Sequence, residues 1–166
     1  MSALKNDLKI LEENILSDKS RSADVWQATF KAELTESDFE EVIGEVEFNG
    51  RFTVEWQRYF YGYVPEMHPD DWVIRVDFPH FNYKLNVDYP VDTDVIYALL
   101  VEGGSSMRRG GVIVGGTFRI LEMNPLEGKV HGQFNNVWTE PWQPDGVEVP
   151  PAYARIISFR SNGKKL

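Results

Sequence analysis

The sequence predicts a mainly β domain, all-β or α+β, built as an antiparallel β-sandwich or barrel behind an N-terminal amphipathic helix. Segments of alternating apolar and polar residues recur along the 166 residues, and this period of two is typical of half-buried strands. Gly, Pro and Asn lie between these segments, as in turns. Aromatic residues, which pack well on pleated surfaces, make up 13% of the chain. The pattern does not separate a sandwich from a barrel.

The length suits a single domain over residues 1–166. A domain of about 150 residues buries roughly 68–70% of the surface that its unfolded chain exposes, so a core can form without help from a partner. The chain contains no internal repeat and no linker that would divide it.

An amphipathic helix is expected over about residues 2–16. Ser2 can act as its N-cap, and four apolar residues share one helical stripe: Leu4, Leu8, Leu11 and Ile15. The polar residues 17–22 end this pattern.

The first strand is expected from Trp26 to Leu34, where the alternation is clearest. A helical turn or a loop follows. Asn49-Gly50 then predicts a hairpin turn. Apolar residues occupy even positions on both sides of this pair, so a three-residue loop with a left-handed Gly50 is expected, pairing Val46 with Phe52.

Two further alternations, residues 72–78 and 81–87, predict antiparallel strands joined at Pro79-His80. Residues 92–102 fit either a short helix, capped by Asp92 and stopped by Gly103, or a strand buried on both faces, and the helix is favoured. Residues 103–111 are glycine-rich and predict a flexible loop.

A hairpin is expected over residues 116–134, with Asn124-Pro125 and Gly128 in its turn. Pairing Ile120 with Val130 would place the ring of Phe118 over Gly132. Residues 141–151 predict a surface connection, residues 154–159 a final strand, and residues 161–166 a frayed, flexible tail.

Composition narrows the functional classes. The chain has no cysteine, which excludes disulfides, thiolate metal sites and a cysteine nucleophile. The net charge of -9 and the absence of a basic stripe argue against nucleic-acid binding. No signal peptide and no run of about 18 apolar residues is present, so a cytoplasmic protein without membrane contact is expected.

No complete catalytic constellation is found, and no cofactor is expected. His68, Asp70 and Asp71 supply ligand types for a divalent ion, but their spacing matches no metal signature and suits a turn equally well. Arg108 and Arg109 could hold an anion between their flanking glycines, although a hairpin tip explains them more simply.

The sharpest charge asymmetry is a run of seven acidic residues without one Lys or Arg: Glu33, Glu36, Asp38, Glu40, Glu41, Glu45 and Glu47. A basic partner would relieve its self-repulsion, so Glu40, Glu41, Glu45 and Glu47 are candidate docking residues, the alternative being a solvated edge. Tyr59, Tyr61 and Tyr63 form a second candidate surface, because they share one face of a predicted strand.

The leading hypothesis is therefore a non-enzymatic binding domain that presents an acidic, tyrosine-rich surface to a basic protein partner, as a cytoplasmic immunity-type neutraliser would. Self-association stays open. The alternative is a barrel that binds a small hydrophobic ligand in an interior lined by Trp26, Phe30, Trp56 and Phe60, which a filled core would rule out. A second alternative is a metal-assisted enzyme using His68, Asp70 and Asp71.

Overall fold

The computed structural model describes residues 24–54, 60–63, 72–103, 108–141, 146 and 148–166, with residues 60–63 described through their backbone. The helix predicted over residues 2–16 lies outside this part of the chain. Nine strands lie within it: β1 (Val25–Thr35), β2 (Val42–Val54), β3 (Phe60–Tyr63), β4 (Trp72–Phe78), β5 (Asp88–Pro90), β6 (Tyr97–Glu102), β7 (Arg109–Asn124), β8 (Lys129–Thr139) and β9 (Tyr153–Lys165).

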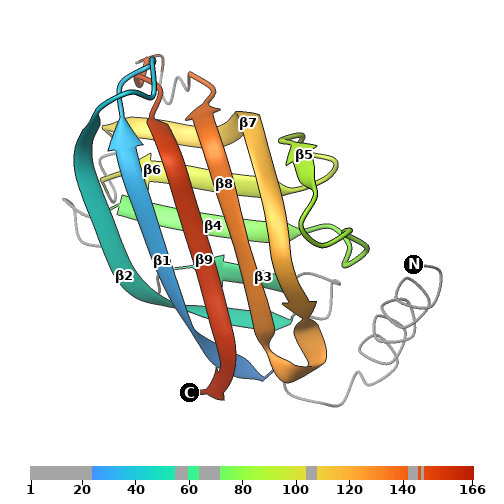
Figure 1. The fold of residues 1–166 in the computed structure, drawn as a ribbon. Helices are drawn as coiled ribbons and strands as arrows, with labels where there is room; N and C mark the ends of the chain where they lie inside the picture. The colour runs from blue at the N-terminus through green and yellow to red at the C-terminus, as the bar shows by residue number, and fades with distance from the viewer. Residues whose placement is uncertain (1–23, 55–59, 64–71, 104–107, 142–145, 147) are drawn as a thin grey trace.

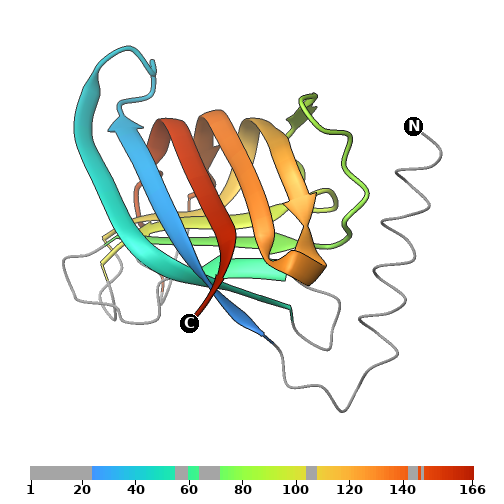
Figure 2. The same cartoon turned by 60° about the horizontal axis from the view of Figure 1, so that its bottom comes forward.

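The strands form one barrel-shaped antiparallel sheet. Neighbours pair in the order β1, β2, β3, β4, β6, β7, β8 and β9, and β9 pairs with β1 again, while β5 pairs with β7 at the side. In Figure 1, strands β2, β1, β9, β8 and β7 make the front wall, and β3, β4 and β6 cross behind them. Figure 2 shows the sheet curling round on itself. The predicted mainly β antiparallel fold is confirmed, in its barrel form.

Aromatic rings fill the middle of the barrel. Phe159 lies with its ring centroid 5.7 Å from that of Phe134 and 5.9 Å from that of Phe78. From Phe134 the contacts continue to Phe118 at 6.0 Å, from there to Tyr83 at 5.7 Å, and back to Phe78 at 5.8 Å. These five rings, the five-ring core, are at most 2% exposed. The inward-facing residues of strands far apart in the sequence thus pack as one cluster.

The turn predicted at Asn49-Gly50 is wrong. β2 runs straight through it, with Asn49 opposite Thr29 and Gly50 opposite Ala28. The chain instead reverses between β1 and β2, where Phe39 has φ of 59° and its N–H donates to the carbonyl of Glu36 at 3.1 Å. An uninterrupted strand keeps every even residue on one face, so no bulged loop is needed to explain the pattern.

The strand predicted over residues 81–87 is also wrong. No strand forms between β4 and β5, although Phe81 and Tyr83 are buried while Leu85 and Val87 are exposed. The Tyr83 hydroxyl donates to the carbonyl of Val95. Two inward-facing side chains are therefore held by burial and by this hydrogen bond, without a ladder.

The short helix favoured for residues 92–102 is wrong, and the strand alternative is correct for residues 97–102. Asp92 does make a cap-like contact, since its Oδ1 accepts from the Asp94 N–H at 2.9 Å. It closes one turn, after which Tyr97 begins β6, paired with β4 and β7. Pairing on both sides makes β6 an interior strand, whose apolar run resembles a buried helix in sequence.

The hairpin of β7 and β8 has the predicted turn and a different register. Asn124 caps a 3-10 turn at Pro125–Glu127, which ends on a left-handed Gly128 with φ of 67°. Ile120 lies opposite Gly132, so the predicted pairing of Ile120 with Val130 is wrong by two residues. A ring does cover Gly132, but it belongs to Phe159: a Cβ at that glycine would lie 2.3 Å from it.

Residues 161–165, expected in a frayed tail, instead complete β9. The N–H of Leu166 donates to the carbonyl of Val25 at 3.0 Å. This last segment therefore has paired neighbours on β1 and β8.

Candidate functional site

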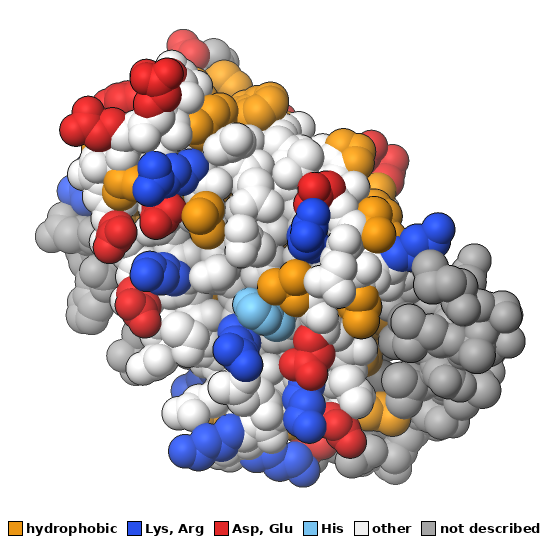
Figure 3. All heavy atoms as spheres, viewed as in Figure 1, with side chains coloured by type: hydrophobic (Ala, Val, Ile, Leu, Met, Phe, Trp, Pro, Cys, Tyr) orange, Lys and Arg blue, Asp and Glu red, His pale blue; other side chains and the backbone are white. Residues whose placement is uncertain are grey.

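The predicted acidic residues gather at one end of the barrel. Glu40 and Glu41 lie where the β1–β2 turn enters β2, and Glu45 and Glu47 follow on the outer face of β2. We call the exposed carboxylates of this region the acidic hairpin end: Glu36, Asp38, Glu40, Glu41, Glu45 and Glu47. Figure 3 shows Asp and Glu side chains clustered over this corner.

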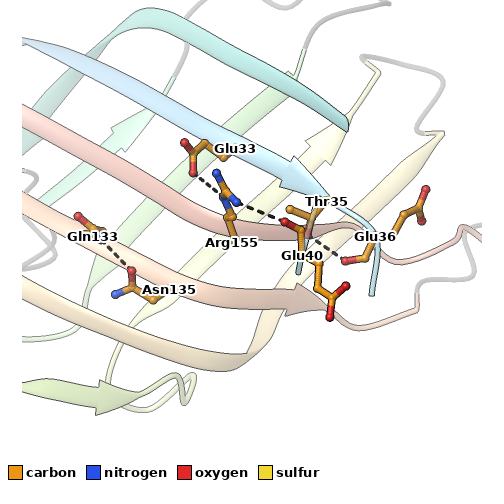
Figure 4. Close-up of polar contacts among 7 residues, drawn as sticks. All are labelled: Glu33, Thr35, Glu36, Glu40, Gln133, Asn135 and Arg155. Atoms are coloured by element: carbon orange, nitrogen blue, oxygen red, sulfur yellow. Dashed lines mark hydrogen bonds and ion pairs between the residues drawn. The ribbon is translucent and has the colours of Figure 1, made fainter. Parts of the chain in front are cut away.

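Arg155 makes hydrogen bonds at the acidic hairpin end, and Lys31 lies opposite Glu47 in the β1–β2 ladder. Arg155 of β9 donates from Nε to the carboxylate of Glu33 at 3.0 Å and from Nη1 to the backbone carbonyl of Glu40 at 3.4 Å (Figure 4). In the described part of the chain, no ion pair is made by the carboxylates of Glu40, Glu41, Glu45 and Glu47. Arg155 therefore links the β1–β2 turn to β9, while the carboxylates of Glu40, Glu41, Glu45 and Glu47 form no ion pair with a described residue.

The structure describes only some of the other predicted site residues. Tyr59 and the metal candidates His68, Asp70 and Asp71 lie outside the described residues. Tyr61 and Tyr63 lie in β3, where their backbones pair with Thr53 and Arg51. Elsewhere in the described residues, no group of three or more His, Cys, Asp or Glu side chains is arranged to hold a metal ion.

A cluster of three aromatic rings lies beside the acidic hairpin end. The ring of Phe39 lies 6.3 Å from that of Trp138 and 6.0 Å from that of Tyr153. We call Phe39, Trp138 and Tyr153 the aromatic cluster. Trp138 is 40% exposed, and its indole lies flat on Gly115, where a Cβ would approach within 2.0 Å. The exposed tryptophan is thus held between a glycine of β7 and the β1–β2 turn.

The contacts between these three rings are not predictable from the sequence. Phe39 comes from the β1–β2 turn, Trp138 from the end of β8 and Tyr153 from the start of β9, and no local pattern joins these segments. Asp38 and Glu40 flank Phe39 in the chain, so carboxylates border the rings directly. An exposed hydrophobic side chain, Ile43, is 50% exposed between Glu41 and Glu45 on the same strand.

The barrel required by the ligand-binding alternative is present, and the described side chains in its middle are closely packed. Trp26 and Phe30, two of the predicted lining residues, are 3% and 0% exposed, and Phe30 stacks on Phe48 and Phe52. A side chain beside a water-sized void would keep accessible surface, and Phe30 and Phe52 keep none. Trp56 lies outside the described residues, and Phe60 is described only through its backbone.

No family model, curated protein or solved structure matches the chain. In the described residues, no helix is long and apolar enough to cross a membrane.

The buried hydroxyl of Tyr83 has a structural partner, whereas the buried Oγ of Ser161 has no hydrogen-bond partner among the described residues. Burial, and secondarily the neighbouring Tyr89, raises the pKa of Tyr83 above its ordinary value of 10.0, so its hydroxyl stays protonated and donates to Val95. Arg108 and Arg109, considered above for anion binding, both form ion pairs with Glu102, at 3.4 and 3.7 Å. These contacts give Tyr83, Arg108 and Arg109 a structural role and indicate no catalytic or ligand-binding role for them.

Proposed function

We propose that this chain is a non-enzymatic binding domain that docks a basic protein partner on its acidic hairpin end. The observation that carries the proposal is the combination of the exposed Trp138, fixed by Gly115 and Phe39, with carboxylates that have no cationic partner among the described residues.

Each component has a distinct role in binding. Tryptophan and tyrosine are enriched among interface residues that contribute most affinity, because they bury a large area with little rotamer entropy to lose. Unpaired exposed carboxylates attract a basic surface before contact and so raise the association rate. Because side chains occupy the described interior, the outer surface is the place where a partner would bind.

The test begins with capture of partners from the native host on immobilised protein, followed by kinetics on each purified candidate. Glu45→Lys should slow association several-fold and flatten its dependence on salt, because the charge acts before contact. Trp138→Ala should instead speed dissociation, with an affinity loss of about thirtyfold for a hot spot of roughly 2 kcal/mol.

Glu122→Lys is the matched control, since Glu122 is also exposed on the outer face of a strand, near the opposite end of the barrel. It carries the same charge change and should alter the association rate much less than Glu45→Lys. The same rate constants for Glu45→Lys and Glu122→Lys, together with undiminished binding by Trp138→Ala, would remove the proposal.

A further inference from the structure

A polar groove lies on the outer face of the barrel, at the far end of β1 and β2 from the acidic hairpin end. It has a volume of about 170 Å³ and crosses β2, β1 and β9; its lining residues are Gln27, Ala28, Thr29, Asn49, Arg160, Asn162 and Lys164. No Asp or Glu is among them. In Figure 3, Lys and Arg side chains gather toward the lower end of this face, where the C-terminus lies in Figure 1.

The two cations of the groove lack carboxylate partners. Ion pairs hold seven other basic residues of the described part: Arg75, Arg108, Arg109, Arg119, Lys129, Arg155 and Lys165. Neither Arg160 nor Lys164 forms an ion pair with a described residue. In a chain of net charge -9, two neighbouring cations without acids keep their full donor capacity for a ligand.

A β-bulge shapes the groove. Trp26 lies opposite Lys165 and Ala28 opposite Ser161, so three residues of β9 lie across from Gln27 alone. The middle residue, Gly163, has φ of 81°, and a Cβ there would lie 2.5 Å from the backbone oxygen of Glu127. Bulges commonly re-aim side chains next to functional sites. Asn162 and Lys164, the residues on either side of Gly163 in the chain, both line the groove.

The donors of the groove match one class of ligand. Arg160 offers a guanidinium fork, Lys164 three N–H donors, and the amides of Gln27, Asn49 and Asn162 further N–H groups. A single carboxylate would satisfy one arginine, whereas a phosphoryl group has a second negative charge and further acceptor oxygens for the lysine and the amides. The volume is below the roughly 300–1,000 Å³ of pockets for drug-sized ligands, so a small ligand is indicated.

We infer that the groove between β2, β1 and β9 binds the phosphoryl group of a small phosphate monoester, with Arg160 and Lys164 as its charged contacts. The site is independent of the acidic hairpin end and shares no residue with it. Loss of either site leaves the other in place.

The test is an NMR titration of the full chain with inorganic phosphate, O-phosphoserine and acetate at constant ionic strength. Phosphate should shift the backbone signals of Thr29, Asn49 and Asn162 and the ring signals of His131, which lies opposite Arg160 on β8. Acetate should bind at least about tenfold more weakly, because it has one charge and two oxygens. O-phosphoserine binding more tightly than inorganic phosphate would indicate contacts to the carrier, and equal affinity would indicate recognition of the phosphoryl group alone.

Variants decide whether the groove is the site. Arg160→Gln and Lys164→Gln should each weaken phosphate binding about tenfold, as expected for loss of a charge-assisted hydrogen bond. Arg75→Gln is the matched control, since it removes the same charge from an exposed arginine that is paired with Asp77 on β4, and it should leave binding unchanged. Shifts that do not saturate, equal affinity in Arg160→Gln and Arg75→Gln, or acetate binding as tight as phosphate binding would overturn the inference.

Discussion

Phe159→Ala tests whether the barrel interior is a packed core. The Phe159 ring is 0% exposed, contacts Phe134 and Phe78 at 5.7 and 5.9 Å, and covers Gly132. Removing a buried phenyl ring costs about 3–5 kcal/mol through lost transfer free energy and the cavity left behind. Each lost aromatic pair adds roughly 0.5–1.5 kcal/mol, so the upper part of that range, about 4–5 kcal/mol, is expected.

Urea unfolding followed by tryptophan fluorescence measures this loss. With a slope of about 2 kcal/mol per molar urea, the midpoint should fall by roughly 2 M. Ile43→Ala, at a 50% exposed position on the outer face, should cost less than about 1 kcal/mol. A loss for Phe159→Ala as small as that for Ile43→Ala would show that the interior is loosely packed, and the argument against an interior ligand would fail with it.

Two further predictions concern contacts at the surface. Gly115→Ala should cost about 1–3 kcal/mol and move the indole N–H signal of Trp138 in NMR spectra, because a Cβ would lie 2.0 Å from that ring; an unmoved signal would contradict the packing. Burial, followed by the charge of Arg160, lowers the pKa of His131 against the opposing effect of Glu122. The unfolded chain therefore binds the proton more readily, so the free energy of unfolding should decrease as pH falls through about 6.5. Urea unfolding should show less of this decrease in His131→Gln, and Arg160→Gln should raise the His131 pKa in an NMR titration.

The sequence predicts strands well where one face of the strand packs inward along its whole length. Trp26 to Leu34 and Trp72 to Phe78 alternate in sequence and alternate in burial as β1 and β4. Apolar residues at even positions on both sides of Asn49-Gly50 fit one continuous strand as well as the three-residue loop that the sequence predicts, and the structure has the strand. Local turn chemistry favours the loop, whereas the pairing of Gly50 with Ala28 on β1 is a long-range contact that no short window reveals.

The failures elsewhere have the same origin. Alternation at Phe81 and Tyr83 reflects real burial, but no ladder forms there; within the described residues, the segment makes a single backbone hydrogen bond to β7, from Asn86 to Ile120. The register of β7 against β8 includes shifts at three places in the ladder, and the hairpin sequence alone does not show where such bulges fall.

Exposure of the acidic residues could be predicted from their density alone, since a run of carboxylates is costly to bury. The aromatic cluster could not, because Phe39 and Trp138 meet only after the barrel closes. The polar groove could not be predicted for a different reason. Arg160, Asn162 and Lys164 lie in β9, whereas the sequence predicts a final strand only to residue 159 and a frayed tail from residue 161.

The two proposed sites follow from one property of the barrel. The five-ring core packs the middle of the described barrel, with Phe78, Phe118, Phe134 and Phe159 fully buried, and both proposals therefore rest on outward-facing side chains. Along β1 and β2 those side chains change from unpaired carboxylates at the turn to the unpaired Arg160 and Lys164 beside the opposite end. Screening limits each charge to about 8–10 Å at physiological salt, so the two ends act separately. We expect a basic protein to be attracted to the turn, and an anion to bind where the acids no longer repel it.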